Sequence, residues 1–181
     1  MRRRVLQYKQ LFLVQMTFDM PHIAAPSMTP DTAIANFRAS AGETLQLHNW
    51  RDADWQQLFR FTTFRSVAPG DVLIRQGEPE RTIYFVLRGQ LEVVLRSGDG
   101  ISMGRVALVE AGSILGEVAF FDGGPRSATA WAVDGCEVAA MTLDQFREFG
   151  KTNPDLAREL VFALGRILAT RLRQTNARLV S

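Results

Sequence analysis

The chain has 181 residues, of which 21 are Lys or Arg and 19 are Asp or Glu, so its formal net charge is only +2. This length suits one domain with extensions, and 46% hydrophobic residues with 22% charged residues is typical of a globular chain. So small a net charge gives no argument that the domain as a whole binds nucleic acid.

The charges are unevenly distributed along the chain. Residues 1–10 hold four basic groups and no acid, and residues 158–181 hold five arginines and one acid. The 147 residues between these ends carry 12 basic and 18 acidic groups, a net charge of −6. A mildly acidic body is therefore flanked by basic ends, which leaves open a nucleic-acid or anionic-membrane binder that uses those ends.

Several classes of protein are excluded by what the chain lacks. A single cysteine, Cys136, excludes an internal disulfide and gives no case for an oxidising compartment. With only His22 and His48 beside it, a His/Cys metal site is not expected. No apolar run approaches the roughly 20 residues needed to span a bilayer. We therefore expect a cytoplasmic protein with no metal, no cofactor and no transmembrane segment.

Residues 1–30 are the least domain-like part of the chain. Arg2–Arg4 and the apolar residues 11–14 faintly resemble a secretion signal, but polar residues interrupt the apolar stretch. Three methionines, at positions 16, 20 and 28, are alternative translation starts. We expect residues 1–30 to be a leader or a poorly ordered extension.

Two short N-terminal helices are predicted in residues 31–61. Thr29-Pro30-Asp31 is a helix start, and Gly42 is a stop. Asp52 is placed to cap a second helix over residues 53–61, which buries Trp55, Leu58 and Phe59.

Residues 62–142 predict an antiparallel β-structure of about eight strands. Short β-branched and aromatic runs alternate with turn residues every eight to twelve positions, a pattern typical of a sandwich or barrel. Asp134-Gly135 is a hairpin signal between the last two of these runs. The runs are residues 72–74, 83–87, 91–95, 103–109, 127–133 and 137–142.

Helices return in residues 143–181. One helix is expected from residue 142 to about Gly150, and Asn153-Pro154 starts another that can run unbroken to Val180. The order of helices, strands and a long last helix predicts an α+β domain built on a β-roll.

No catalytic motif is complete in this sequence. Gly150-Lys151-Thr152 resembles the end of a phosphate-binding loop, but Gln145 stands where that motif needs a glycine. There is no Gly-x-Ser-x-Gly nucleophile motif, and neither histidine lies where it would activate a nucleophile. The sequence therefore predicts a protein that is not an enzyme.

The segment from Gly112 to Ala130 is the strongest candidate site. It is predicted to be a strand end, one short helical turn, a glycine-rich loop and an arginine that enters the next strand. Arg126 offers a planar fork of N–H donors for a phosphate, and Glu117 can accept hydrogen bonds from a sugar hydroxyl. The alternative is structural, because Glu117 and Arg126 can simply pair with each other across an ordinary loop.

At these residues the sequence resembles the cyclic nucleotide-binding domain family. The family's phosphate-binding cassette is matched by Leu115-Gly116-Glu117, Ala119 and Arg126-Ser127-Ala128, and an upstream glycine pattern by Gly77 and Gly89. The resemblance covers roughly residues 50–180. Glu80 and Phe120 depart from the family pattern, which usually has a small residue and an aliphatic residue there.

The resemblance implies an eight-stranded antiparallel jelly-roll β-barrel with flanking N-terminal helices and a long C-terminal helix. It implies that Glu117 holds the ribose 2′-hydroxyl, that Arg126 and the Ala119 N–H hold the cyclic phosphate, and that the last helix caps the base. The cassette would span residues 115–128. The implied binding residues are Gly116, Glu117, Val118, Ala119, Arg126, Ser127 and Ala128, with base contacts from Val86 and from Arg171 or Thr175.

The resemblance leaves the ligand and the partners open. We expect a sensor of cAMP or cGMP, and the sequence does not choose between them. Because the chain ends at Ser181, we expect no DNA-binding domain after the last helix, and the effector protein is not identified. The last helix is apolar around much of its circumference, which favours a homodimer or, alternatively, packing on the N-terminal helices. A nucleotide-independent scaffold of the same fold is the other candidate function.

Overall fold

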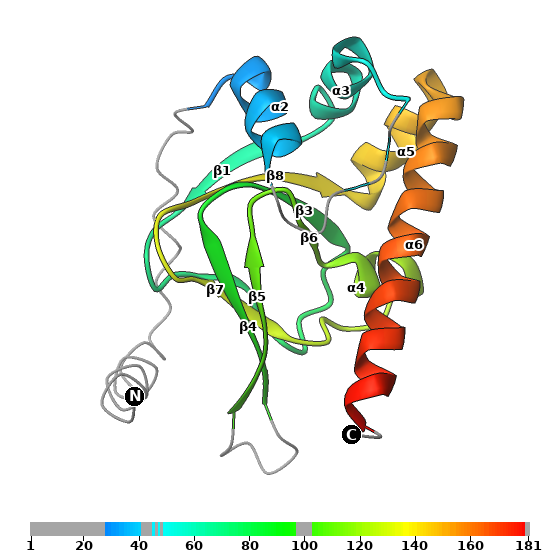
Figure 1. Ribbon diagram of the computed structural model, residues 1–181. Helices are drawn as coiled ribbons and strands as arrows, with labels where there is room; N and C mark the ends of the chain where they lie inside the picture. The colour runs from blue at the N-terminus through cyan, green and yellow to red at the C-terminus, as the bar shows by residue number, and fades with distance from the viewer. Residues whose placement is uncertain (1–27, 41–44, 46, 48, 97–102, 180–181) are drawn as a thin grey trace.

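The structure, a computed structural model, describes residues 28–40, 45, 47, 49–96 and 103–179. The elements follow the order helices, strands, helices (Figure 1). Of the leader predicted over residues 1–30, positions 1–27 lie outside the described residues, and Pro30 already belongs to the first described helix. The helices are α2 (Pro30–Ala39), α3 (Asp52–Phe59), α4 (Glu117–Asp122), α5 (Leu143–Thr152) and α6 (Pro154–Leu179). The strands are β1 (Thr63–Val67), β2 (Val72–Ile74), β3 (Thr82–Arg88), β4 (Gln90–Arg96), β5 (Met103–Glu110), β6 (Ile114–Leu115), β7 (Thr129–Ala132) and β8 (Cys136–Thr142).

The eight strands form two four-stranded antiparallel sheets. One sheet has the order β1-β8-β3-β6 and the other the order β2-β7-β4-β5. The predicted α+β class and eight antiparallel strands are confirmed, but the roll is a pair of sheets rather than one closed barrel. Strands β1 and β6 lie outside the runs that the sequence pattern singled out.

Strands β3 and β8 are buried on both faces, which is why their sequences are almost continuously apolar. Alternate residues of β3 enter two different cores, because successive side chains of a strand point to opposite faces. Ile83, Phe85 and Leu87 pack under the helices, whereas Tyr84 and Val86 face the interior between the two sheets. The first sheet is therefore the wall between the helical layer and the inside of the roll.

The prediction of a hairpin at Asp134-Gly135 is wrong. Strand β7 pairs with β2 and β4, while β8 pairs with β1 and β3, so this turn carries the chain from one sheet to the other. The Asp134 carboxylate accepts a hydrogen bond from the backbone N–H of Gln90 at 2.9 Å. A tight turn signal fixes a local reversal of direction, but it does not fix which strands pair.

The N-terminal helices begin and end close to the predicted positions. Thr29 caps α2 by accepting a hydrogen bond from Thr32, but the helix ends at Ala39, before Gly42. Asp52 is the first residue of α3 rather than its cap. Arg51 takes the cap position, and the Asp54 carboxylate accepts the Arg51 backbone N–H at 2.8 Å.

Helix α6 runs unbroken over 26 residues, as predicted, and its first half is anchored to the body. Its buried residues pack with those of α5 and the N-terminal segment in the core under the first sheet. The Trp50 indole N–H donates to a Glu159 carboxylate oxygen at 2.8 Å. The helix then passes beside α4, and its second half extends along the edge of the roll (Figure 1).

Candidate functional site

Gly116 sets the geometry of the predicted cassette. It joins β6 to α4 with a backbone φ of 83°, in the left-handed region that favours glycine. A Cβ at this position would lie 2.5 Å from the Thr82 carbonyl oxygen and would also collide with the Arg126 guanidinium. Only glycine therefore lets the short helix start against β3 with Arg126 packed beside it.

Arg81 and Arg126 hold the two ends of the cassette. The Arg81 guanidinium donates to the Phe120 carbonyl oxygen at 2.7 and 3.3 Å, near the end of α4. The backbone of Arg126 is pinned by two hydrogen bonds to the loop before β3, one from its N–H to the Glu78 oxygen and one from the Gly77 N–H to its own oxygen, each 2.9 Å. These contacts fix where the Arg126 side chain starts.

The Arg126 side chain is buried, with an exposed fraction of 2%. Its Nη1 donates to the Gly116 carbonyl oxygen at 3.1 Å, and the guanidinium lies 5.6 Å from the centre of the Tyr84 ring. Nη2 lies 3.3 Å from a Glu80 carboxylate oxygen, close enough for an ion pair but without hydrogen-bond geometry. Nε and Nη2 therefore have no hydrogen-bond partner among the described residues, although both are buried.

Glu80 and Tyr84 respond to this buried arginine. Partial burial raises the pKa of Glu80, but a hydrogen bond from Thr82, the positive charge of Arg126 beside it and a hydrogen bond from Tyr84 outweigh it, so the net pKa lies below its ordinary value. Burial raises the pKa of Tyr84 to about 12, helped by the nearby Glu80 charge. Glu80 is thus an anion and Tyr84 a neutral hydroxyl at neutral pH, and the Tyr84 hydroxyl lies 3.1 Å from a Glu80 oxygen.

Glu117 is the other charged residue of the cassette, and it does not pair with Arg126. Its carboxylate, 5% exposed, accepts a hydrogen bond from Arg171 Nη1 at 2.6 Å. Arg171 also donates through Nη2 to the Ile114 carbonyl oxygen at 2.8 Å. The sequence left open a direct pair between Glu117 and Arg126. In the structure, Arg126 instead pairs with Glu80 from the loop before β3, and Glu117 pairs with Arg171 from α6.

A cavity of about 100 Å³ lies between the cassette, the inner strands and α6. Most of the predicted binding residues line it: Gly116, Glu117, Val118, Ala119, Arg126, Ser127, Ala128 and Arg171. Val86 and Thr175 are not among the lining residues. Val86 is fully buried in the core of the roll, and Thr175 is exposed, with its hydroxyl donating back to the Arg171 carbonyl oxygen at 2.9 Å.

The apolar walls of this cavity were not predicted from the sequence, apart from Leu115, which belongs to the cassette motif. They are Ile74, Val93, Leu115 and Ala130, from strands of both sheets. Each is one apolar residue in a strand of similar residues, so only the pairing of the strands distinguishes it. Glu80 was noted only as a departure from a family pattern, although it is the residue that pairs with Arg126.

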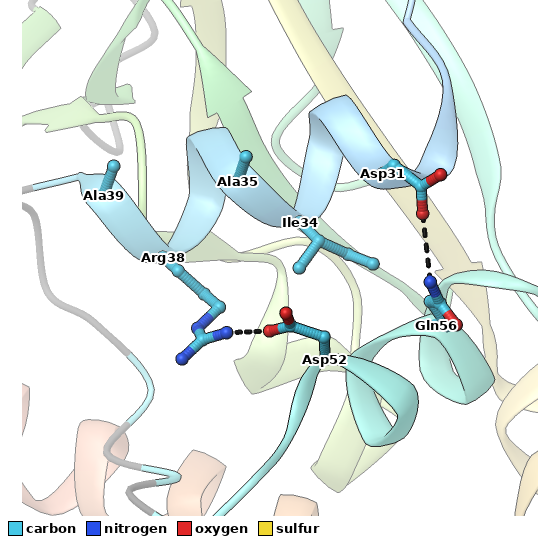
Figure 2. Close-up of a pocket in the computed structure, with 7 residues that line it drawn as sticks. All are labelled: Asp31, Ile34, Ala35, Arg38, Ala39, Asp52 and Gln56. Carbon is cyan, nitrogen blue, oxygen red and sulfur yellow. Dashed lines mark hydrogen bonds and ion pairs between the residues drawn. The ribbon is translucent and has the colours of Figure 1, made fainter.

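A second hollow lies between α2 and α3 (Figure 2). It is an open groove of about 560 Å³ and shares no lining residue with the cassette cavity. Arg38 pairs with Asp52 across it, and Gln56 donates to Asp31 at 3.0 Å. These contacts join the two helices to each other, so the groove's charged groups already have partners.

Other functional motifs are not realised in the described part of the chain. Gly150-Lys151-Thr152 lies at the end of α5, so it is helix and not a phosphate-binding loop. The residues that the structure describes contain no group of three or more His, Cys, Asp or Glu side chains placed to hold a metal ion. Of the described helices, none combines the length and hydropathy that crossing a membrane requires.

Comparisons with known proteins identify the class to which this fold and cassette belong. Residues 64–153 match the family model of the cyclic nucleotide-binding domain. The cAMP-activated global transcriptional regulator CRP of Salmonella typhimurium is 33% identical over 97 residues, which are 53% of this chain and 46% of that protein. The chain thus spans about half the length of this relative.

Solved structures agree with the fold. A cyclic nucleotide-binding domain from Methylobacillus flagellatus matches with a TM-score of 0.70 and 22% identity, over 82% of this chain and 84% of that one. The catabolite activator protein of Thermus thermophilus matches with a TM-score of 0.67 and 24% identity, over 75% and 62%. Residues 64–153 therefore form a cyclic nucleotide-binding domain, and this part of the chain belongs to that domain family.

Proposed function

We propose that this protein binds a 3′,5′-cyclic nucleotide, cAMP or cGMP, in the cassette cavity and acts as a regulatory sensor rather than an enzyme. Arg126 holds the cyclic phosphate, together with the backbone N–H of Ala119. Glu117 accepts the ribose hydroxyl. Gly116, Val118, Ser127 and Ala128 complete the cassette. The relatives' regulatory character supports this proposal at the level of the family.

One observation carries the proposal: the buried edge of Arg126 that makes no hydrogen bond with the described residues. Nε and Nη2 form one face of the planar guanidinium, and both are buried without a hydrogen-bond partner. Leaving such donors unpaired costs free energy, so a native site that keeps them needs a compensating acceptor. Two phosphate oxygens match that edge, because arginine binds phosphate through two parallel N–H bonds.

The first experiment is a calorimetric titration of the purified chain with cAMP and with cGMP. We expect a dissociation constant of about 1 µM or below for at least one of them, which corresponds to about 8 kcal/mol. Charge-assisted hydrogen bonds contribute roughly 1.5–3 kcal/mol each, so Arg126 and Glu117 supply much of that energy. The matched control is 5′-AMP, which has an adenosine but an open phosphate. The proposal is refuted if neither cyclic nucleotide binds at about 1 mM, because even a binding free energy of about 4 kcal/mol would be detected at that concentration.

The nucleotide-independent scaffold remains a second candidate, and the two ion pairs favour it specifically. Because Glu80 pairs with Arg126 and Arg171 pairs with Glu117, both cassette charges have partners within the chain. The presence of Glu117 and Arg126 therefore does not by itself require a ligand. The same titration separates the two functions, since a scaffold gives no heat with either nucleotide.

We also propose that the protein forms a homodimer through the outer face of α6. Val161, Gly165, Leu168 and Leu172 follow one another at spacings of four, three and four residues, the repeat of a two-helix seam. The flanking Phe162 is 66% exposed and Leu172 is 62% exposed, so this apolar face is not covered by the described part of the chain. A second copy of α6 matches the repeat because a symmetric contact places the same stripe on both sides.

Light scattering at several protein concentrations tests the dimer. We expect twice the chain mass for the unmodified protein and the single chain mass for Leu172→Glu, because a charge in the seam is left unpaired. Gln174→Glu, an exposed position two residues further along the helix, is the control and should stay dimeric. A single chain mass for the unmodified protein at all concentrations removes the dimer proposal.

A further inference from the structure

Glu80 places a carboxylate beside the arginine that the proposed function assigns to the phosphate. One of its oxygens lies 3.3 Å from Nη2 of Arg126. The guanidinium of the adjacent Arg81 is bound elsewhere, to the Phe120 carbonyl oxygen at 2.7 Å. Glu80 also departs from the family pattern at this position of the sequence. Its charge is therefore a property of this chain, and it bears directly on Arg126.

The Glu80 carboxylate is charged and is held in place. The Tyr84 hydroxyl donates to one of its oxygens at 3.1 Å. Partial burial raises the pKa of Glu80, but the hydrogen bond from Thr82 and the positive charge of Arg126 outweigh burial, so the net pKa lies below its ordinary value. At neutral pH an anion therefore faces the guanidinium from the loop before β3.

Arg126 does not depend on Glu80 for its position. Its Nη1 donates to the Gly116 carbonyl oxygen at 3.1 Å, and its backbone makes hydrogen bonds with Gly77 and Glu78, each 2.9 Å. These contacts all remain when only the charge of Glu80 is removed. What Glu80 changes is therefore the electrostatic potential at Arg126 and not the place where the arginine lies.

The two ion pairs at the cassette leave their four side chains without a net charge. Arg126 pairs with Glu80, and Arg171 pairs with Glu117. Without the Glu80 carboxylate, two arginines and one glutamate would remain, a net charge of +1. Glu80 is not among the residues that line the cassette cavity, so its carboxylate does not fill the space of a ligand. It opposes an anionic ligand through its charge, and Coulomb repulsion grows in proportion to the charge of the ligand.

We propose that Glu80 sets the charge preference of the nucleotide site, by favouring the singly charged phosphate of a cyclic nucleotide over the more highly charged phosphate of a 5′-nucleotide. This inference rests on the proposed function and adds a determinant of its specificity. A cyclic phosphate is a diester with one negative charge, whereas a phosphate monoester carries about 1.5–2 at neutral pH. Glu80 therefore weakens the binding of both ligands, and in free energy it weakens that of the monoester up to about twice as much.

Calorimetric titration of Glu80→Gln tests this preference, because glutamine keeps the size of the side chain and removes its charge. We expect the preferred cyclic nucleotide to bind about fivefold more tightly, which equals about 1 kcal/mol, the upper end for exposed ion pairs. The 5′-nucleotide with the same base, measured by competition, should gain up to about 25-fold. The ratio of the two dissociation constants should therefore fall by up to about fivefold.

Two further variants separate the charge of Glu80 from its packing. Glu80→Asp keeps the negative charge on a shorter side chain and should keep the discrimination against the 5′-nucleotide. Glu148→Gln is the matched control, because Glu148 is an exposed glutamate on α5 that pairs with Lys151 and does not line the cavity. Its affinities for both ligands should equal those of the unmodified protein. A purely structural defect would change both affinities by the same factor, whereas loss of the charge changes their ratio.

Unfolding in urea tests the underlying ion pair without any nucleotide. If the Glu80 charge acts on Arg126, Glu80→Gln lowers the urea midpoint of the unmodified chain, because a buried guanidinium loses its counter-ion. The same change should leave the midpoint of Arg126→Met unchanged, since the arginine is already gone. Equal midpoints with and without the Glu80 charge in both backgrounds would overturn the inference, because the carboxylate would then have no measurable effect on the arginine.

The titrations separate this inference from the function on which it rests. If no protein, Glu80→Gln included, binds a cyclic nucleotide, the proposed function fails and this inference fails with it. Binding by Glu80→Gln alone supports the role of Glu80, because its charge then closes the site to the ligand. Unchanged or weaker binding of the cyclic nucleotide by Glu80→Gln, or an unchanged ratio to the 5′-nucleotide, overturns the inference and leaves the proposed function standing.

Discussion

Replacing Arg126 with methionine separates a ligand-binding arginine from a structural one. Methionine has a similar length and no charge, so it fills the space without leaving a large cavity. The change removes the Nε–Nη2 edge, which makes an ion pair with Glu80 but no hydrogen bond, and the hydrogen bond from Nη1 to Gly116. If Arg126 binds the ligand, the variant loses nucleotide affinity. If Arg126 is structural, the variant loses free energy of unfolding.

The loss in affinity follows from the edge itself. Two charge-assisted hydrogen bonds to a phosphate contribute about 3–6 kcal/mol together. We therefore expect Arg126→Met to weaken binding of the preferred cyclic nucleotide by at least roughly 100-fold. For Arg126→Ala, a loss of only about 2 kcal/mol in binding free energy already weakens nucleotide binding by roughly 30-fold.

The free energy of unfolding should change little. The Gly116 carbonyl oxygen keeps a hydrogen bond from the Phe120 N–H at 3.2 Å, so it is not left unsatisfied. Glu80 is 42% exposed and can be hydrated once its partner is gone. The removed guanidinium also had two buried nitrogens without a hydrogen bond, whose desolvation opposes folding. These effects offset one another to within about 1 kcal/mol.

Calorimetric titration and urea unfolding on the same preparations measure both quantities. Arg88→Met is the control: Arg88 pairs with Glu137 from an exposed position on β3 and does not line the cavity, so affinity should be unchanged. A fall of about 3–5 kcal/mol in unfolding free energy with nucleotide affinity intact would refute the reasoning, because it is the signature of breaking a buried structural pair.

Three further predictions concern the frame of the domain. Gly116→Ala should lower the unfolding free energy by at least about 1–2 kcal/mol, because alanine is strained at φ 83°, and urea unfolding measures the change. Burial raises the pKa of Cys136 to about 12, so thiol reagents at pH 8 should label it only after unfolding. The same shift contributes stability that is present below the unfolded thiol's pKa of about 8.5 and is lost as pH rises towards 12, and a flat unfolding free energy over that range would contradict it. Trp50→Phe removes the indole hydrogen bond to Glu159 and should cost about 1.5–3 kcal/mol in unfolding free energy, with no change expected if that bond does not hold α6.

The cassette shows what residue identity alone determines. Gly116, Glu117 and Arg126 stand in an order that predicts a short helical turn, an acceptor and a fork of donors, and the structure has the turn where it was expected. The spacing of these residues predicts the turn correctly because all three lie within one local segment. The roll's antiparallel class also followed from local runs and turns, since each strand of seven residues carries its own pattern.

Pairing between distant segments was decided only by the tertiary structure. The Asp134-Gly135 turn has the sequence of a hairpin, yet it joins two sheets, because the partners of β7 and β8 are chosen by packing elsewhere. The same holds for the site: Glu117 and Arg171 are 54 positions apart, and Arg126 and Glu80 are 46 apart. The sequence by itself determined which charged side chains the cassette carries. Which partners those charges take within the chain depended on where α6 and the loop before β3 pack, because ion pairs form between neighbours in space.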